Sequence, residues 1–166
     1  MTFAWRPARA DDLAAIAAIA AAVHPGYPED EAVFAERLKL FPDGCRILAD
    51  AVPVGYLLSH PWTSGELPKL NSLLGALPER PSTYYVHDLA LLEQARGRGH
   101  AETAIRDVIA IARQLGLATV SLVAVNGTTG FWRRFGLSVQ DDSGLTARLR
   151  SYDEEAAYMV LGLDQA

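Results

Sequence analysis

The chain has 166 residues, 50% of them hydrophobic and 21% charged, which fits one globular domain over residues 1–166. The net charge of −5, with no basic run longer than two residues, argues against nucleic acid as a partner. Cys45 is the only cysteine, which rules out an internal disulfide, and the scattered histidines form no recognisable metal-binding motif.

The N-terminal part of the chain predicts one strand and two helices. Residues 2–7 read as a short strand, and residues 12–23 and 31–40 carry apolar side chains at helical spacing. The Ala-rich run in the first helix faintly resembles a signal peptide, but Asp11 and Asp12 interrupt it and suit a helix N-cap. We therefore expect a helix of the mature protein and a cytoplasmic location. No apolar run is long enough to span a membrane.

A hairpin and a long loop are expected next. Residues 46–50 and 52–59 look like two strands joined around Ala51. Residues 61–81 contain several Pro and Gly residues and no clear periodicity. Loops of this length are often functional, and the alternative is a disordered surface loop.

A glycine-rich turn between a strand and a helix is the most informative segment. Residues 84–91 read as a strand, and the turn Gln94-Ala95-Arg96-Gly97-Arg98-Gly99-His100-Ala101 leads into an amphipathic helix that ends near Gly116. A strand at residues 119–125 follows, so the two strands are expected to be parallel. Backbone N–H groups at a helix N-terminus suit a phosphate. The alternatives are an ordinary turn or an Arg-Gly patch that touches nucleic acid.

The C-terminal part completes a mixed α/β order. Residues 127–135 predict a short helix, residues 136–140 begin a strand, and residues 156–163 form a last strand. The turn lacks the Gly-Lys-Ser/Thr of a Walker loop, and it lacks the third glycine of the dinucleotide fingerprint. Neither of those phosphate motifs explains it.

The chain resembles the GNAT superfamily of acetyl-CoA-dependent N-acetyltransferases. Gln94-Ala95-Arg96-Gly97-Arg98-Gly99 matches the superfamily's cofactor motif Gln/Arg-x-x-Gly-x-Gly/Ala. Residues 86–91 resemble its central strand, and residues 125–137 resemble its Asn…Phe-Tyr-x-x-x-Gly-Phe signature. The resemblance implies a single-domain α/β fold with a mostly antiparallel sheet, a splayed central parallel pair and flanking helices.

The resemblance also implies where acetyl-CoA binds. Amides of the turn would hold the pyrophosphate, the central strand would pair with the pantetheine arm, and the Asn-to-aromatic segment would line its other side. The implied contacts are Leu89, Ala90, Leu91, Arg96, Gly97, Arg98, Gly99, His100, Ala101, Asn126, Phe131 and Trp132. No metal is implied.

Catalysis in this family is attack of a neutral amine on the thioester. The Leu91 amide would face the thioester oxygen as an oxyanion donor. His87 is the candidate base, because an imidazole titrates near neutral pH, and Tyr85 could share its face of the strand. Asp88 points the other way on a regular strand, although a bulge would reverse that. The alternative for His87 is a hydrogen-bonded core histidine.

Trp132 departs from the family pattern. Many members have a Tyr there that protonates the leaving thiolate, and an indole is not a usable acid. The thiolate could leave unassisted, Tyr152 or Tyr158 could substitute, or the protein could be a catalytically weak acyl-CoA-binding or sensor module. The expected acceptor is a primary amine of a small molecule, and the resemblance allows a homodimer. Tyr27, residues 61–81 and residues 141–152 are expected to shape the acceptor pocket.

Overall fold

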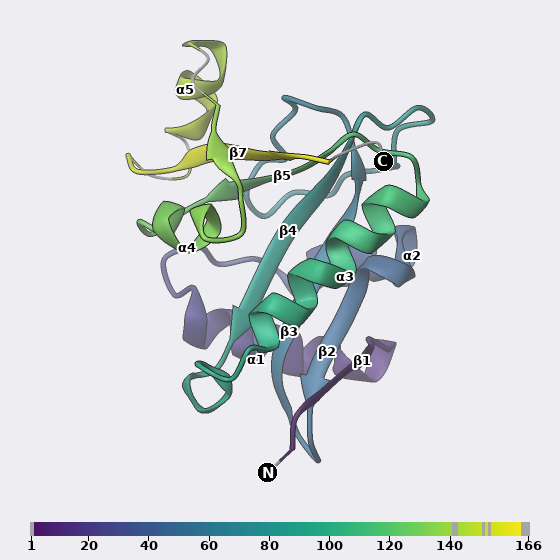
Figure 1. Cartoon of the computed structure of the whole chain (residues 1–166). Coiled ribbons are helices and arrows are strands. Elements are labelled where there is room, and N and C mark those ends of the chain that lie inside the picture. Colours follow the sequence, from purple (N-terminus) through teal and green to yellow (C-terminus); the bar gives the residue numbers. More distant parts are fainter. Residues whose placement is uncertain (1, 141–142, 151, 153, 164–166) are drawn as a thin grey trace.

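The computed structural model describes residues 2–140, 143–150, 152 and 154–163, and one sheet runs through this part of the chain (Figure 1). Its strand order is β1-β2-β3-β4-β5-β7-β6. The strands are β1 (Ala4–Pro7), β2 (Cys45–Ala49), β3 (Pro53–Trp62), β4 (Thr83–Leu91), β5 (Thr119–Ala124), β6 (Ser138–Val139) and β7 (Ala157–Gly162). All neighbouring strands are antiparallel except β4 and β5, which are parallel.

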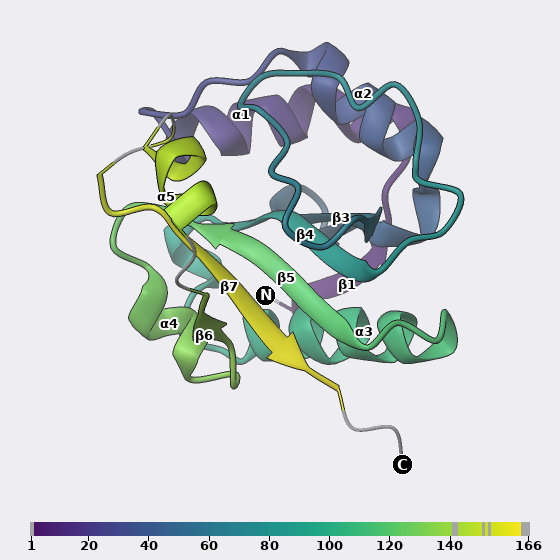
Figure 2. The same cartoon turned by 90° about the horizontal axis from the view of Figure 1, so that it is seen from above.

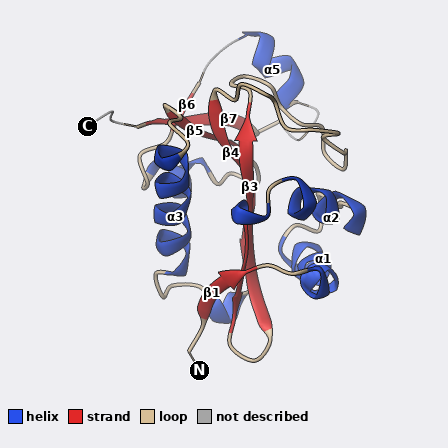
Figure 3. Ribbon diagram, turned by 90° about the vertical axis from the view of Figure 1, so that its right-hand side faces the viewer, coloured by secondary structure: helices blue, strands red, loops and turns tan. Residues whose placement is uncertain are grey.

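Helices cover both faces of the sheet. Figure 3 shows α3 on one face and α1 and α2 on the other. The helices are α1 (Leu13–Val23), α2 (Glu31–Leu40), α3 (His100–Gln114), α4 (Thr129–Arg133) and α5 (Ser143–Leu149), with short 3-10 turns at η1 (Ala10–Asp12), η2 (Pro42–Gly44) and η3 (Glu93–Ala95). None of the helices in the described ranges is long and apolar enough to cross a membrane.

The core lies in two layers that follow this arrangement. On the α3 side, Ala104 and Val108 pack against Tyr84 and Leu122. On the other side, helix residues such as Ile16 and Phe34 pack with strand residues from β2, β3 and β4. Burial of a large apolar side chain stabilises the fold by about 1.5–3 kcal/mol. The two layers therefore hold the central strands from both faces.

The parallel pair at the centre is short and then separates. β4 and β5 pair only through residues 84–86 and 120–122, although both strands continue beyond this point. In Figures 1 and 2, β5 and β7 turn away from β4. The second half of β4 thus keeps a free edge on this side, which confirms the splayed parallel pair.

A β-bulge lies in β4 where the separation begins. Leu58 of β3 pairs with Asp88 and Ser59 pairs with Val86, so His87 is the extra residue. The bulge changes which residues share a face, and it places Asp88 on the α1–α2 side, where its carboxylate bonds to His24. The structure thereby reverses the orientation that a regular strand predicts for Asp88.

The predicted elements agree with the structure in order and, within a few residues, in their bounds. The α/β class with a mostly antiparallel sheet is confirmed. Helix α5 falls within residues 141–152, where no helix was expected, and residues 141, 142 and 151 of that segment lie outside the described part. Cys45 begins β2 and is buried, and desolvation raises the pKa of its thiol to about 12, as befits a core residue.

Candidate active site

A cavity of about 500 Å³ lies between the end of β4, the glycine turn, the first turn of α3 and α4. We call it the donor cavity. Its walls combine backbone of the turn with aromatic and basic side chains. It is lined by Val23, His24, Leu89, Leu91, Arg96, Gly97, Gly99, His100, Ala101, Glu102, Thr128, Phe131, Trp132, Arg134 and Phe135.

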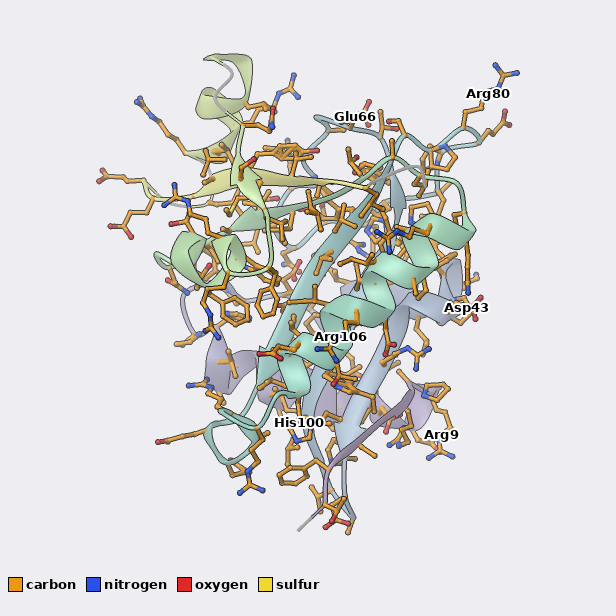
Figure 4. All side chains as sticks on the ribbon, in the orientation of Figure 1. Arg9, Asp43, Glu66, Arg80, His100 and Arg106 are labelled. Carbon is orange, nitrogen blue, oxygen red and sulfur yellow. The ribbon has the colours of Figure 1, made fainter. Side chains whose placement is uncertain are left out.

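The glycine turn gives the donor cavity an anion-binding end. Gly97 and Gly99 have φ of +73° and +83°, a left-handed conformation that favours glycine. Gly99 is the N-cap of α3 and makes no side-chain cap bond, so the first amides of the helix lack intrahelical partners. Figure 4 shows His100 at this end of α3. These amides and the helix dipole suit a phosphate or pyrophosphate.

The free edge of β4 supplies backbone groups along the same cavity. The amide of Leu92 donates to the carbonyl of Val54 at 2.8 Å, and this fixes which residues of β4 bond to β3. Hydrogen-bonding residues alternate in an antiparallel pair, so the amides of Leu89 and Leu91 point away from β3. β5 has already separated there. Both amides therefore face the space that an added extended chain would fill.

Some predicted contacts lie away from the cavity wall. Ala90 is buried in the α1–α2 core layer and pairs with Tyr56 of β3. The Arg98 guanidinium lies 5.7 Å from the centroid of the Phe3 ring. Asn126 follows β5 in a left-handed conformation, and it lines neither the donor cavity nor the smaller cavity that adjoins it. The nine other predicted contacts line the donor cavity.

Arg134 lines the donor cavity although its sequence position alone does not single it out. It adds a second arginine to the cavity lining besides Arg96, whose Nε donates to the Leu91 carbonyl at 3.0 Å. Arg134 lies directly after α4 and two residues after Trp132. Its position in the Phe-Trp-Arg-Arg-Phe segment was the available signal, since residues near a motif often line the same cavity.

A second, smaller cavity of about 100 Å³ adjoins the first, and we call it the acceptor cavity. It is lined by His24, Tyr27, Glu29, Lys69, Leu70, Tyr85, Val86, His87, Asp88, Leu89, Leu122, Val123, Val125, Trp132 and Tyr152. His24, Leu89 and Trp132 line both cavities, so they mark the junction. The two predicted catalytic side chains, His87 and Tyr85, both lie on the acceptor side.

His87 is paired with a carboxylate from the other side of the cavity. Its Nε2 lies 2.8 Å from Oε1 of Glu29, which precedes α2. Desolvation opposes the charge of Glu29, but the hydrogen bond and the charge of His87 outweigh it and lower the pKa of this carboxyl. The pair leaves Nδ1 of His87 without a hydrogen-bond partner among the described residues.

A second histidine–carboxylate pair occupies the junction. His24 Nε2 lies 2.8 Å from Oδ1 of Asp88, and the hydroxyl of Tyr56 donates to the other oxygen of the same carboxylate. Burial disfavours the charged His24, yet the hydrogen bond and charge of Asp88 raise its pKa overall. Burial alone would raise the pKa of Asp88, but His24 and Tyr56 lower it. The pair therefore favours an imidazolium beside a carboxylate.

Tyr85 has a different environment from the two histidines. It is buried, and desolvation raises the pKa of its phenol well above the ordinary value, which keeps it neutral. His60 packs 5.6 Å from it, ring centre to ring centre, and burial lowers the pKa of His60 to about 3. Tyr85 is accordingly a neutral hydrogen-bonding group and not a proton acceptor.

The loop at residues 63–82 borders the acceptor cavity, and Figure 2 shows it beside α2. Lys69 and Leu70 of this loop line the cavity. Asn71 fastens it on one side, where its backbone N–H donates to Glu29 at 3.0 Å and its side-chain Oδ1 accepts from the Asp30 backbone N–H at 2.7 Å. On the other side, the Tyr152 hydroxyl donates to the Pro68 carbonyl.

The sequence model of the acetyltransferase (GNAT) family matches residues 13–137. This range includes β4 and α4, which line both cavities, and α3, which lines the donor cavity. The chain belongs to this family. The family match supports an acyltransferase activity. No curated protein sequence matches the chain.

Solved structures of GNAT proteins share the fold across nearly the whole chain. The GNAT-like decarboxylase GphF in complex with isobutyryl-CoA is 18% identical with a TM-score of 0.78, covering 97% of this chain and 100% of its own. The NatC complex bound to Gag peptide and CoA is 17% identical with a TM-score of 0.74, covering 99% and 100%. Arabidopsis thaliana Naa50 with the bisubstrate analogue CoA-Ac-MVNAL is 13% identical with a TM-score of 0.70, covering 96% and 97%.

The donor cavity fits the coenzyme that these structures contain. A GNAT protein needs an anion site for the pyrophosphate and a free strand edge for the pantetheine arm, and the turn and β4 supply both. Among the described residues, no group of three or more His, Cys, Asp or Glu side chains could hold a metal ion.

Proposed function

We propose that the protein transfers an acetyl group from acetyl-CoA to a primary amine of a small molecule. The meeting of the two cavities at Leu89 and Trp132, beside the free amides of β4, carries this proposal. A thioester that follows the β4 edge from the glycine turn would reach this junction. An amine in the acceptor cavity would then lie next to it.

Residues of the donor cavity would bind and polarise the thioester. The amides of residues 97–101 would hold the pyrophosphate, with Arg96 adding charge. The Leu89 amide would pair with the pantetheine arm, and the Leu91 amide would donate to the thioester oxygen as negative charge develops on it. Phe131 and Trp132 would cover the arm from α4.

The size of the acceptor cavity and its fastened loop favour a small amine over a peptide. The cavity is about 100 Å³, and the loop at residues 63–82 that borders it is fastened from both sides. Glu29 places a carboxylate in its wall, which suits a ligand that arrives as an ammonium ion. Tyr27, Tyr85 and Tyr152 add aromatic surface for such a cation.

His87 is the proposed base. An alkyl ammonium, with a pKa of about 10, must lose a proton before its nitrogen can attack. His87, held by Glu29, accepts that proton. The nitrogen then forms a bond to the acetyl carbon, the carbon–sulfur bond breaks, and its electrons pass to sulfur.

Ligand binding and turnover together test this function. Acetyl-CoA at about 100 times its Kd should stabilise the fold by about 2.7 kcal/mol, which raises Tm by about 5–10 °C for a chain of this size. Thiol release should then be measured with a panel of small primary amines and with a panel of short peptides. A small primary amine should be a better acceptor than any of the peptides.

His87→Gln should lower kcat/KM by about 10²-fold or more, without changing acetyl-CoA affinity. A thermal shift without turnover of any amine would favour the acyl-CoA-binding or sensor role that Trp132 suggests. No shift at millimolar acetyl-CoA would reject both functions. Peptides better than every small amine would reject the acceptor class.

A further inference from the structure

The leaving thiolate needs a proton, and the position that would supply it in many GNAT proteins holds Trp132. An indole donates a hydrogen bond but is not a usable acid. Trp132 lines the junction of the two cavities, so the group that replaces the missing acid must also reach this junction. Tyr152 and Tyr85 line the acceptor cavity alone, and Tyr158 lines neither.

We propose that His24 is the general acid that protonates the sulfur of CoA as it leaves, with Asp88 as its positioning residue. The inference rests on the proposed acetyl transfer and adds a catalytic residue to it. His24 is the one titratable side chain that lines both cavities in the part of the chain that the structure describes. His87, by contrast, lines only the acceptor cavity.

The geometry around His24 fits an acid. Its Nε2 is bound to Asp88 at 2.8 Å, and its Nδ1 has no hydrogen-bond partner among the described residues. A protonated ring therefore donates Nε2–H to Asp88 and retains an Nδ1–H that can be transferred. Tyr56 donates to the second oxygen of Asp88, so the carboxylate is held from two sides and orients the ring.

The surrounding charges also favour the imidazolium form. His24 is the C-cap residue of α1, where the helix dipole stabilises a positive charge. Asp88 on β4 and Glu29 before α2 raise the pKa of His24, whereas Arg96 at the end of η3 and burial lower it. Tyr56 stays neutral, because burial raises the pKa of its phenol well above its ordinary value.

The protons balance when the two histidines act separately. The ammonium loses its first proton to His87 before attack, and the nitrogen loses a second proton to water as the amide forms. When the carbon–sulfur bond breaks, Nδ1–H of His24 transfers its proton to sulfur and CoA leaves as a thiol. His24 is then neutral beside Asp88 and regains a proton from solvent. His87 returns its own proton to solvent, so one proton is released overall.

Titration of CoA bound to the protein tests the proposal without an acceptor. Thiolate absorbance reports the pKa of the CoA thiol, which is about 8.5 for a free thiol. An imidazolium beside the sulfur should lower it by about one pH unit or more in the wild-type complex. His24→Gln should return it to the free value. His87→Gln, the same substitution in the other pair, should leave the bound thiol as in wild type.

Turnover provides the second measurement. His24→Gln should lower kcat by about 10²-fold or more and remove the alkaline limb of its pH profile. Asp88→Asn should shift that limb to lower pH, because the ring loses its anionic partner. CoA affinity of each variant reports whether its donor cavity is intact.

The outcomes separate the two proposals. A bound thiol that titrates alike in wild type and His24→Gln overturns the acid role and leaves acetyl transfer standing. An alkaline limb that survives in His24→Gln also overturns it. A wild-type protein that binds no CoA overturns acetyl transfer and the acid role together.

Discussion

At the scale of single residues, Gly99 connects a backbone conformation to the donor cavity. It has φ of +83° and no atom within 4 Å of an added Cβ, so an alanine there is strained but meets no clash. Gly116, near the other end of α3, has φ of +70° and equally open surroundings. An L-residue in this conformation costs about 1–2 kcal/mol. The two glycines therefore form a matched pair that differs in position alone.

We expect Gly99→Ala and Gly116→Ala to lose similar amounts of stability in denaturant unfolding. Only Gly99→Ala should weaken CoA binding, by about tenfold for each 1.4 kcal/mol lost as the turn relaxes away from its present shape. Calorimetric titration with CoA measures this. Equal CoA affinity in the two variants would show that the turn does not hold the coenzyme.

The glycine turn and His24 show what a sequence does and does not reveal at this scale. The glycine turn was predictable because glycine spacing, the preceding strand and the following helix are all local features. His24 was not singled out, because its partner Asp88 lies 64 residues later. A histidine directly after a helix and before Pro25-Gly26 is an ordinary helix end when read alone.

At the scale of elements, the bulge in β4 decides which side chains share the acceptor cavity. The extra residue at His87 lets both His87 and Asp88 line that cavity, where a regular strand would send them to opposite faces. Sequence periodicity could place the strand at residues 84–91, but it could not place the bulge. Bulges depend on the pairing with β3, which local residues do not encode.

The loop at residues 63–82 is the element that should set acceptor size. Asn71→Ala removes the two hydrogen bonds that the Asn71 side chain makes with Asp30, one from the Asp30 amide at 2.7 Å and one to its carboxylate at 3.4 Å, each worth about 0.5–1.5 kcal/mol. We expect the KM of the amine to rise several-fold, bulkier amines to become accepted, and the Kd of acetyl-CoA to stay unchanged. Steady-state kinetics with amines of graded size measures this.

Arg80→Ala is the control for the loop, since Arg80 lies in the same segment and extends away from the body of the protein in Figure 4. It should behave as wild type. An Asn71→Ala variant with unchanged acceptor range would show that the loop does not limit the acceptor.

At the scale of the whole molecule, the His24–Asp88 pair links stability to pH. The pKa of His24 is raised in the fold, so its contribution is complete below the ordinary histidine value of about 6.5 and fades as pH rises through the raised value. The pKa of Asp88 is lowered, so its contribution is complete above about 3.9 and fades as pH falls through the lowered value.

His24→Gln should therefore lose the most stability relative to wild type between about pH 4 and 6.5 and the least in alkaline solution. Denaturant unfolding of both proteins across this range gives the difference in free energy. A difference that does not change with pH would mean that the pair is not ionised as the structure indicates.

The overall architecture was predictable because its strands and helices have strong local patterns and follow the family order. The acceptor cavity was not, because four separate segments of its lining, represented by His24 and Glu29, by Lys69, by Asp88 and by Tyr152, come together only in the fold. The expectation that Tyr27, residues 61–81 and residues 141–152 border this cavity holds for Tyr27, Lys69, Leu70 and Tyr152. The conformations that bring them together depend on long-range hydrogen bonds.

The different origins of the two cavity walls have an evolutionary consequence. Most of the donor wall comes from residues 89–102 and 128–135, two nearly continuous stretches, whereas the acceptor wall depends on a loop that contributes no strand and no helix. Under the proposed function, mutations in that loop would change the acceptor while the donor cavity stays the same. One ancestral coenzyme site can in this way serve related enzymes that differ in acceptor specificity.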